Sequence, residues 1–158
     1  MSDLRVGIGV DAHALAAGVP LVLGGVELDH PRGLAGHSDG DVVAHALIDA
    51  LLGAAALGDI GGLFPSGEDT PRGVSSLALL ADAYEQVKAA GFKLVNADCV
   101  LVGEEPRIAS HRDEMRRRLQ AAIGEGEVNV RATTMDRLGF TGRGEGIAAH
   151  AIALLERR

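Results

Sequence analysis

The sequence predicts an α+β fold in which helices pack on one face of a mixed four-stranded sheet. Three observations lead to this prediction. Runs rich in branched apolar residues alternate with longer Ala- and Leu-rich segments, the longer segments stop at glycines, and the elements follow the order β-β-α-α-β-α-β-α. Because the chain has no repeat and no linker, we expect one domain over residues 1–158.

The first half of the chain predicts two strands and then two helices. Residues 4–13 are rich in branched apolar side chains, and residues 19–28 form two short strand pieces around a pair of glycines. Residues 41–57 predict a helix because the segment starts with an aspartate, contains no proline and is followed by Gly58. Residues 71–91 predict a second helix that also ends at a glycine.

The second half alternates strands and helices. Residues 93–103 and 128–135 predict strands, and residues 109–124 predict a helix between them. Residues 144–158 are rich in alanine and leucine and end with two arginines, which favours a final helix with cations near its C-terminus. These elements complete a layer of helices on one sheet.

Charge and composition exclude several classes of function. The formal charge is −7 and the aromatic content is 3%, which argues against a phosphate-binding face or a stacking surface for nucleic acid. No basic segment precedes an apolar one at the start, and no apolar run is long enough to span a bilayer. The single cysteine, Cys99, lies in an apolar run and fits a small buried residue in a reducing compartment. We therefore expect a cytoplasmic protein.

Two polar side chains interrupt the first apolar strand. Asp11 and His13 are two residues apart, so both point to the same side of a strand and both can reach one metal ion. His45, on the helix that starts at Asp41, is the best candidate for a third ligand. Such a pattern also arises by chance, so spacing alone leaves a metal site and a pair of ordinary polar residues both open.

A polar stripe on the same helix favours the metal site. Asp41, His45 and Asp49 stand at i, i+4 and i+8, and a carboxylate can orient a metal-bound imidazole. A solvated helix face would give the same stripe. Two histidines and one carboxylate would leave a coordination position open, as in catalytic zinc sites, which would suit a substrate oxygen.

Two polar loops contain the remaining candidate residues for a functional site. The stretch "GHSDGD" contains His37 and Ser38; it also fits an ordinary turn and helix cap, which leaves the histidine unexplained. The stretch "RATTMDRLGFTGRGEG" combines Thr133, Thr134 and Arg143 with four glycines that can bring backbone N–H groups close to an anion. It also fits an ordinary loop, and it is followed by the predicted last helix, whose positive end would face a phosphate.

Taken together, "DAH", "HSDGDVVAHALIDALLGAAALGDIGGLFP" and "ATTMDRLGFTGRGEGIA" resemble the 2-C-methyl-D-erythritol 2,4-cyclodiphosphate synthase family, from about residue 5 to residue 155. The resemblance implies a lyase of the non-mevalonate route to isoprenoid precursors. Such an enzyme converts 4-diphosphocytidyl-2-C-methyl-D-erythritol 2-phosphate into the cyclic diphosphate and CMP. It also implies a homotrimer with active sites between subunits, Zn²⁺ as one metal, and Mg²⁺ or Mn²⁺ with the substrate diphosphate.

The resemblance assigns roles to particular residues. Zinc ligands would be Asp11, His13 and His45, and the transition-state stabilisers would be His37 and Thr134. Substrate-binding residues would be Ser38, Asp59, Gly61, Phe64, Pro65, Gly103, Pro106, Arg107, Thr133, Asp136, Phe140 and Arg143. Within that set, residues 59–65 would hold the methylerythritol phosphate, and residues 103–107 of a neighbouring subunit would hold the cytidine.

The chain departs from the family pattern at three positions. Asp136 stands where a glutamate is usual near the second metal, and Arg137 replaces the usual basic residue with different donor geometry. His150 stands where some relatives carry a glutamate near the central cavity of the trimer, which puts regulation through that cavity in doubt. Two other functions stay open: a zinc phosphoesterase with a bound water as nucleophile, and a non-catalytic trimer that binds a nucleotide or isoprenoid phosphate.

Overall fold

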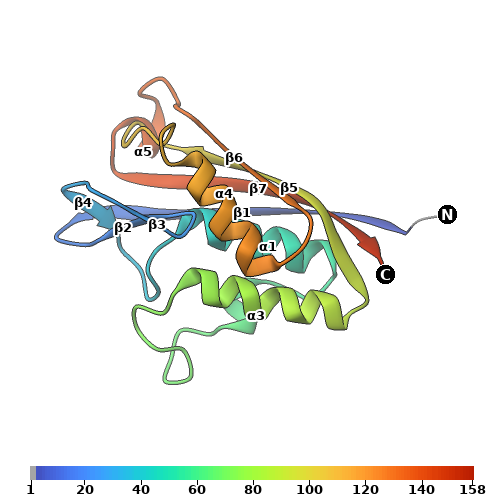
Figure 1. Ribbon diagram of the computed structural model, residues 1–158. Helices are drawn as coiled ribbons and strands as arrows, with labels where there is room; N and C mark the ends of the chain where they lie inside the picture. Colours follow the sequence, from blue (N-terminus) through green and yellow to red (C-terminus); the bar gives the residue numbers. More distant parts are fainter. Residues whose placement is uncertain (1–2) are drawn as a thin grey trace.

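The computed structural model describes residues 3–158 as a five-stranded mixed sheet with helices on one face (Figure 1). The strands are β1 (Leu4–Ala17), β2 (Leu21–Leu23), β3 (Val26–Leu28), β4 (Arg32–Leu34), β5 (Phe92–Val102), β6 (Glu127–Thr133) and β7 (Gly146–Arg157). The helices are α1 (Val42–Ala54), α2 (Ile60–Leu63), α3 (Ser76–Ala89), α4 (Arg112–Ile123) and α5 (Gly139–Gly142).

The sheet has the strand order β4-β1-β7-β5-β6, and β2 and β3 form a separate hairpin. Neighbouring strands are antiparallel except β5 and β6, which are parallel and are connected through α4. The prediction of a mixed sheet under helices is confirmed, but the number of strands is wrong: the sheet has five strands, not four.

The predicted last helix, residues 144–158, is wrong, because this segment is strand β7 in the middle of the sheet. Its Ala- and Leu-rich composition favours a helix in isolation. Its burial instead alternates along most of the strand, with Ala149, Ala151 and Ala153 buried toward the helices and His150 and Ile152 exposed on the other face. Pairing with β1 on one side and β5 on the other outweighs the local helix preference.

The other predicted elements are confirmed with small shifts. Helices α1, α3 and α4 lie within the segments predicted for them, and Gly124 ends α4 with a left-handed φ of 87°. The two strand pieces around Gly24 and Gly25 are β2 and β3, and both glycines have positive φ in the turn between them. The short edge strand β4 was not predicted.

Two glycines on β1 let α1 lie unusually close to the sheet. A Cβ atom at Gly9 would lie 1.8 Å from the backbone oxygen of Ala46, and one at Gly7 would lie 2.0 Å from the backbone oxygen of Ala50. Backbone therefore contacts backbone at this crossing. Since Asp11 points to the same side of β1 as these glycines, the close approach carries its carboxylate to the surface of α1.

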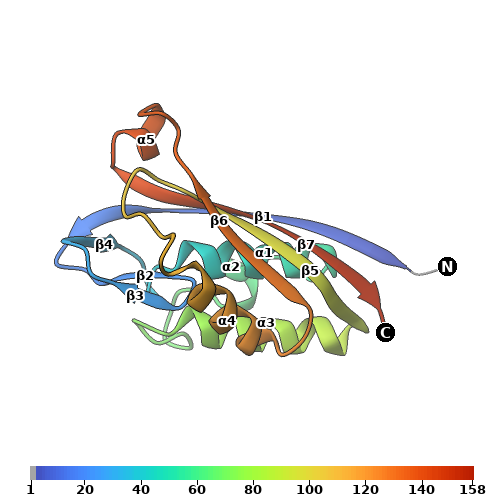
Figure 2. The same cartoon turned by 45° about the horizontal axis from the view of Figure 1, so that its top comes forward.

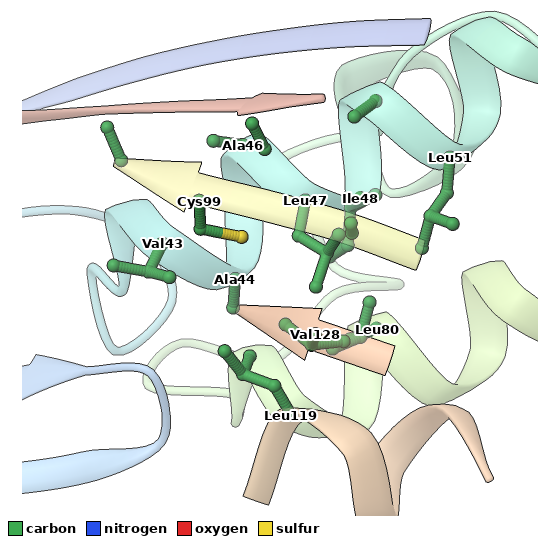
Figure 3. Packing of buried hydrophobic residues seen from close by; sticks show 14 of the residues in the cluster. Val43, Ala44, Ala46, Leu47, Ile48, Leu51, Leu80, Cys99, Leu119 and Val128 are labelled. Carbon is green, nitrogen blue, oxygen red and sulfur yellow. The ribbon is translucent and has the colours of Figure 1, made fainter. Parts of the chain in front are cut away.

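The core lies between the sheet and helices α1, α3 and α4 (Figure 3). Leu47 and Leu51 of α1 are fully buried, and Leu80 and Leu119 join them from α3 and α4. Each fully buried leucine side chain contributes about 1.5–3 kcal/mol through the hydrophobic effect. Cys99 lies unpaired among these side chains, as predicted, and burial raises its pKa to about 12.

Among the elements of residues 3–158, no helix lies against the other face of the sheet (Figures 1 and 2). Val6, Ile8 and Val10 of β1 are 70%, 66% and 55% exposed, and Ile152 lies beside Ile8 on β7. Asp98 and Arg131 form an ion pair at 3.0 Å on the exposed surface of β5 and β6. The open face is thus apolar across β1 and β7 and charged across β5 and β6.

The start of β1 and the end of β7 lie side by side at one end of the sheet, and the loops around β4 and α5 lie at the other end (Figure 1). The backbone N–H of Arg157 donates to the carbonyl oxygen of Asp3 at 3.1 Å. None of the helices between residues 3 and 158 combines the length and the hydropathy needed to cross a bilayer.

Candidate active site

Asp11, His13 and His45 come together as the sequence predicts. Oδ2 of Asp11 lies 2.9 Å from Nε2 of His13 and 3.0 Å from Nδ1 of His45. One ligand atom from each of the three side chains lies within 4.8 Å of the other two. This is the geometry of a three-ligand site for a divalent cation.

The chemistry of the three groups fits a cation between them. Nδ1 of His13 donates to the carbonyl oxygen of Ala35 at 2.6 Å, which leaves the lone pair of Nε2 directed at Asp11. Burial raises the pKa of the Asp11 carboxyl, but the neighbouring His13 and His45 rings outweigh burial and lower the pKa to about 2. The carboxyl is therefore ionised at neutral pH, as a ligand for a divalent cation must be.

The carboxylates of the predicted polar stripe do not orient His45. Asp41 caps α1: it is fully buried and its side chain accepts from the backbone N–H groups of Val43 and Ala44, as well as from the turn between β2 and β3. Asp49 accepts instead from the N–H of Ile60 at 2.7 Å. The residues at Nε2 of His45 are serines, Ser38 at 3.0 Å and Ser76 at 2.8 Å.

The three metal-ligand candidates open into a pocket of about 230 Å³, which we call the metal pocket. His37 and Ser38 line it, as the resemblance implies, and Nε2 of His37 contacts the carbonyl oxygen of Thr70. Since a carbonyl only accepts, this contact places a proton on Nε2 of His37. The three metal-ligand candidates and the predicted stabiliser His37 thus share one cavity.

The predicted sugar-phosphate residues divide into two groups. Gly61 and Phe64 line the metal pocket. Asp59 and Pro65 are exposed beside it and are not among its lining residues, and Asp59 caps α2 by accepting from the N–H of Gly62 at 2.8 Å. The short helix α2 therefore forms one wall of the pocket.

The remaining predicted residues gather near the ends of β5 and β6. The N–H of Gly103 donates to the carbonyl oxygen of Thr133 at 3.1 Å, because parallel strands place their carboxyl ends at the same edge. Thr134 and Asp136 are exposed, with their side-chain oxygens 3.5 Å apart. Phe140 is 43% exposed on α5.

A second cavity of about 760 Å³ lies at this end of the sheet, and we call it the arginine cavity. Its cationic lining residues are Arg32, Arg107, Arg137 and Arg143, joined by Pro106. Arg143 is exposed and pairs with Glu145 at 3.2 Å. The glycines before Gly146 lead into strand β7 and not into a helix, so the predicted helix N-terminus facing a phosphate is wrong.

The predicted residues therefore occupy two separate regions in one chain. Asp11, His13, His37, Ser38 and His45 line the metal pocket, and none of them lines the arginine cavity. Thr133, Thr134 and Asp136 line neither cavity. A single chain does not bring Thr134 into the pocket that holds His37.

Sequence reasoning missed several residues around the metal pocket. Ser76 and Thr70 are buried polar residues that contact His45 and His37, and Asp39 contacts Ser76. One signal was present in the sequence: Ser76 stands three and four residues before Leu79 and Leu80, so it lies on the apolar face of the predicted helix. No local signal points to Thr70, whose backbone carbonyl makes the contact.

The sequence matches one protein family and many enzymes that share a name. A sequence model of the YgbB family matches residues 4–156. The 2-C-methyl-D-erythritol 2,4-cyclodiphosphate synthase of Moorella thermoacetica is 53% identical over 154 residues, which cover 96% of this chain and 94% of that protein. The enzyme of the same name from Rubrobacter xylanophilus is 54% identical over 162 residues, covering 99% and 98%.

Solved structures agree with the sequence comparison. The bifunctional IspDF from Campylobacter jejuni matches with a TM-score of 0.95 and 38% identity; the match covers all of this chain but 43% of that protein. The Plasmodium falciparum IspF in complex with CDP matches with a TM-score of 0.86 and 27% identity, covering 98% of this chain and 97% of that one. The chain therefore belongs to the YgbB family, the family of 2-C-methyl-D-erythritol 2,4-cyclodiphosphate synthases that its sequence motifs resemble.

Proposed function

We propose that this protein converts 4-diphosphocytidyl-2-C-methyl-D-erythritol 2-phosphate into 2-C-methyl-D-erythritol 2,4-cyclodiphosphate and CMP. Relatives of that name match nearly the full chain at more than 50% identity, and this observation carries the proposal. The convergence of Asp11, His13 and His45 in one pocket with His37 supports it independently. In class, the enzyme is a phosphorus-oxygen lyase that releases CMP.

The reaction brings anions together, so the protein must mainly neutralise charge and fold the substrate into line. Asp11, His13 and His45 would hold Zn²⁺, which when bound supplies Lewis-acid polarisation of a phosphate oxygen. His37 and Ser38 line the same pocket and would position the diphosphate. An intramolecular attack held in this way needs no covalent intermediate, and Cys99 is buried away from the site.

The other half of the site would come from a second copy of the chain in a homotrimer. Two observations support this part of the proposal. Thr134 lies outside the pocket that contains His37, so one chain does not assemble both predicted stabilisers. In addition, Val6, Ile8 and Val10 present a continuous apolar surface on the open face of the sheet, which self-association would bury.

We assign the cytidine to the loop formed by Gly103, Pro106 and Arg107, with Thr133 and Thr134 beside the diphosphate. The CDP complex of the Plasmodium falciparum relative supports a cytidine nucleotide as ligand. Asp136 and the substrate diphosphate would share Mg²⁺ or Mn²⁺. Because the aspartate is one methylene shorter than glutamate, we expect a water molecule between this carboxylate and the metal. The lone buried cysteine supports a cytoplasmic location.

The direct test is to incubate the purified protein with the cytidyl substrate, Zn²⁺ and Mg²⁺, and to identify the products by phosphorus NMR. We expect the cyclic diphosphate and CMP in equal amounts. Release of inorganic phosphate would instead indicate a zinc phosphoesterase. Binding of CDP without turnover would indicate a non-catalytic nucleotide-binding trimer, and either result would refute the proposal.

Subunit sharing has its own test. The variants Asp11→Asn and Thr134→Ala should each be inactive as homo-oligomers, but mixed trimers should contain some sites that take an intact half from each variant. After unfolding and refolding in equal amounts, about a quarter of the sites would be intact by random assembly. No recovery of activity in verified mixed trimers would show that each site lies within one chain.

A further inference from the structure

A buried serine at the start of α3 contacts the metal centre. Ser76 is fully buried, and its Oγ lies 2.8 Å from Nε2 of His45. It stands among apolar side chains such as Leu79 and Leu80, where a hydroxyl is costly unless it is hydrogen-bonded. The hydroxyl therefore needs hydrogen-bond partners: His45 and Asp39 are the two near ones, and Oγ of Ser38 lies farther away, at 3.5 Å.

The second partner is Asp39, which contacts Ser76 through both carboxylate oxygens. Oδ1 of Asp39 makes a short hydrogen bond with the Ser76 hydroxyl, and Oδ2 accepts from the backbone N–H of Ser76 at 3.1 Å. Oδ1 also accepts from the backbone N–H of Asp41 at 3.2 Å. An ionised carboxylate only accepts, so the Ser76 hydroxyl must donate its proton to Asp39.

The direction of the hydrogen bond from Ser76 to Asp39 determines which ring nitrogen of His45 is protonated. Once the Ser76 hydroxyl donates to Asp39, its oxygen can only accept from Nε2 of His45, so the ring carries its proton on Nε2. Nδ1 then has a free lone pair, and this atom lies 3.0 Å from Oδ2 of Asp11. The lone pair is thus directed at the same point as the Asp11 carboxylate and Nε2 of His13.

We propose that Asp39 and Ser76 are positioning residues that hold His45 as the Nε2–H tautomer, so that Nδ1 is the atom that binds the divalent metal. The inference rests on the metal-dependent function proposed above and adds two residues to it. Neither residue contacts the bound metal. They act through His45, in the way that outer hydrogen bonds fix ring orientation and basicity at other metal sites.

Ser38 does not replace Ser76 in this role. Its hydroxyl oxygen lies 3.0 Å from Nε2 of His45, but it accepts from the N–H of Gly40 at 3.2 Å, and the hydrogen bonds of residues 3–158 give it no carboxylate partner. Its own proton is therefore free to turn toward His45 or toward the substrate. Only Ser76 has its proton direction fixed by a carboxylate.

The wild-type protein provides the first test, which needs no variant. In zinc-loaded protein labelled with ¹⁵N, two-bond ¹H–¹⁵N correlations assign the protonated and the metal-bound nitrogen of each histidine ring. We expect His45 to carry its proton on Nε2 and to bind zinc through Nδ1. A ring protonated on Nδ1 or bound through Nε2 would overturn the proposal, whatever the turnover of the same sample.

The second test compares two neighbouring serines. Ser76→Ala removes the acceptor from His45 and should weaken zinc binding about 10- to 100-fold, measured by competition with a chelator. Ser75→Ala is the matched control, because Ser75 is exposed and its side chain makes no capping hydrogen bond. We expect the control to bind zinc like the wild type, with unchanged circular dichroism in both variants.

Equal zinc affinity in the two variants would refute the role of Ser76. If Ser76→Ala does not fold, the ring assignment in the wild-type protein still decides the question. Failure of the proposed function is a separate result: it would appear as a wild-type protein that binds zinc through Nδ1 of His45 but releases no CMP from the cytidyl substrate.

Discussion

The metal pocket and the arginine cavity differ in how completely one chain builds them. In the metal pocket, His13 and His45 each have a hydrogen bond on the ring nitrogen that faces away from Asp11, so the side chains are held before any ligand arrives. At the arginine cavity, Arg107 is exposed, and Arg143 is also exposed and pairs with its neighbour Glu145. The side chains of the first region are held by hydrogen bonds to other elements of the chain, whereas those of the second region are exposed.

This difference has a physical origin. The proposed metal ligands come from β1 and α1, two elements fixed against each other through Gly7 and Gly9. The residues proposed to bind cytidine follow the end of β5 and lie in a loop, where backbone groups depend less on the core. We therefore expect substitutions in the first region to affect metal binding and those in the second to affect substrate binding or turnover.

The largest effect should come from removing the carboxylate of the metal pocket. Asp11→Asn takes away the charged ligand while keeping the shape, so we expect turnover to fall about 1000-fold and bound zinc to fall to a trace. Elemental analysis and product formation measure the two effects. Asp82→Asn, at an exposed position of α3, is the control and should change neither. Full zinc content in Asp11→Asn would contradict the assignment.

A smaller effect, confined to turnover, should follow Thr134→Ala in the loop that follows β6, residues 134–138, which we call the threonine loop. Loss of one hydroxyl that stabilises the transition state typically costs about 100-fold in kcat. Because Thr134 lies outside the metal pocket, zinc affinity should stay at the wild-type value. If Thr134→Ala also lost zinc, the two regions would not act independently. The result would show that the threonine loop supports the metal pocket.

Zinc affinity should depend on pH through His13. The hydrogen bond to Asp11 raises the pKa of His13, whereas burial lowers it by less. Since zinc must displace the proton, affinity should fall as the pH decreases below the raised pKa of His13, by about tenfold per pH unit for this one proton. Asp11, with a pKa of about 2, adds nothing in this range. Chelator competition from pH 5.5 to 8 measures the slope, and His150→Ala, on the opposite face, should leave it unchanged.

The raised pKa of His13 also affects the stability of the metal-free protein. A histidine whose pKa is raised in the folded state binds its proton more tightly when folded, so it stabilises the fold fully below its unfolded pKa of about 6.5. That contribution is lost as the pH rises through the raised pKa of His13. Apo protein should therefore lose stability above neutral pH relative to His13→Gln, as thermal unfolding would show.

The smallest effect should come from the exposed side of the arginine cavity. Arg107→Ala removes one solvent-exposed cation, so we expect KM for the cytidyl substrate to rise by less than about tenfold, with kcat nearly unchanged. Steady-state kinetics separate the two constants. Arg117→Ala, an exposed arginine on α4, should have no effect. A fall in kcat larger than the rise in KM would indicate that Arg107 acts in the reaction itself.

Local sequence patterns were sufficient where the structure depends on neighbours along the chain. Helix α1 follows from an aspartate at the cap and a glycine beyond the end, and the pairing of Asp11 with His13 follows from the alternation of side chains on a strand. His45 was the candidate third ligand because of its place on the helix that starts at Asp41, and the family resemblance pointed to the same residue; the structure brings it to Asp11 and His13.

Local sequence patterns were not sufficient to predict structure that depends on contacts between segments far apart in the chain. Strand β7 has the composition of a helix and becomes a strand because β1 and β5 pair with it on both sides. The role of Ser76 depends on α3 lying beside α1, a contact between residues 31 positions apart. Asp41 and Asp49 accept hydrogen bonds from backbone N–H groups outside α1, those of Gly24 and Ile60. Helical spacing alone therefore wrongly suggested that these carboxylates orient His45.

The contact between Asp3 and Arg157 has a practical consequence for engineering. Because Asp3 and Arg157 are already joined by a hydrogen bond, a linker of a few residues should connect them without distorting β1 or β7. A circular permutant could then begin elsewhere on the surface, and labels for single-molecule work could be attached at this end of the sheet, remote from the threonine loop and α5 (Figure 1).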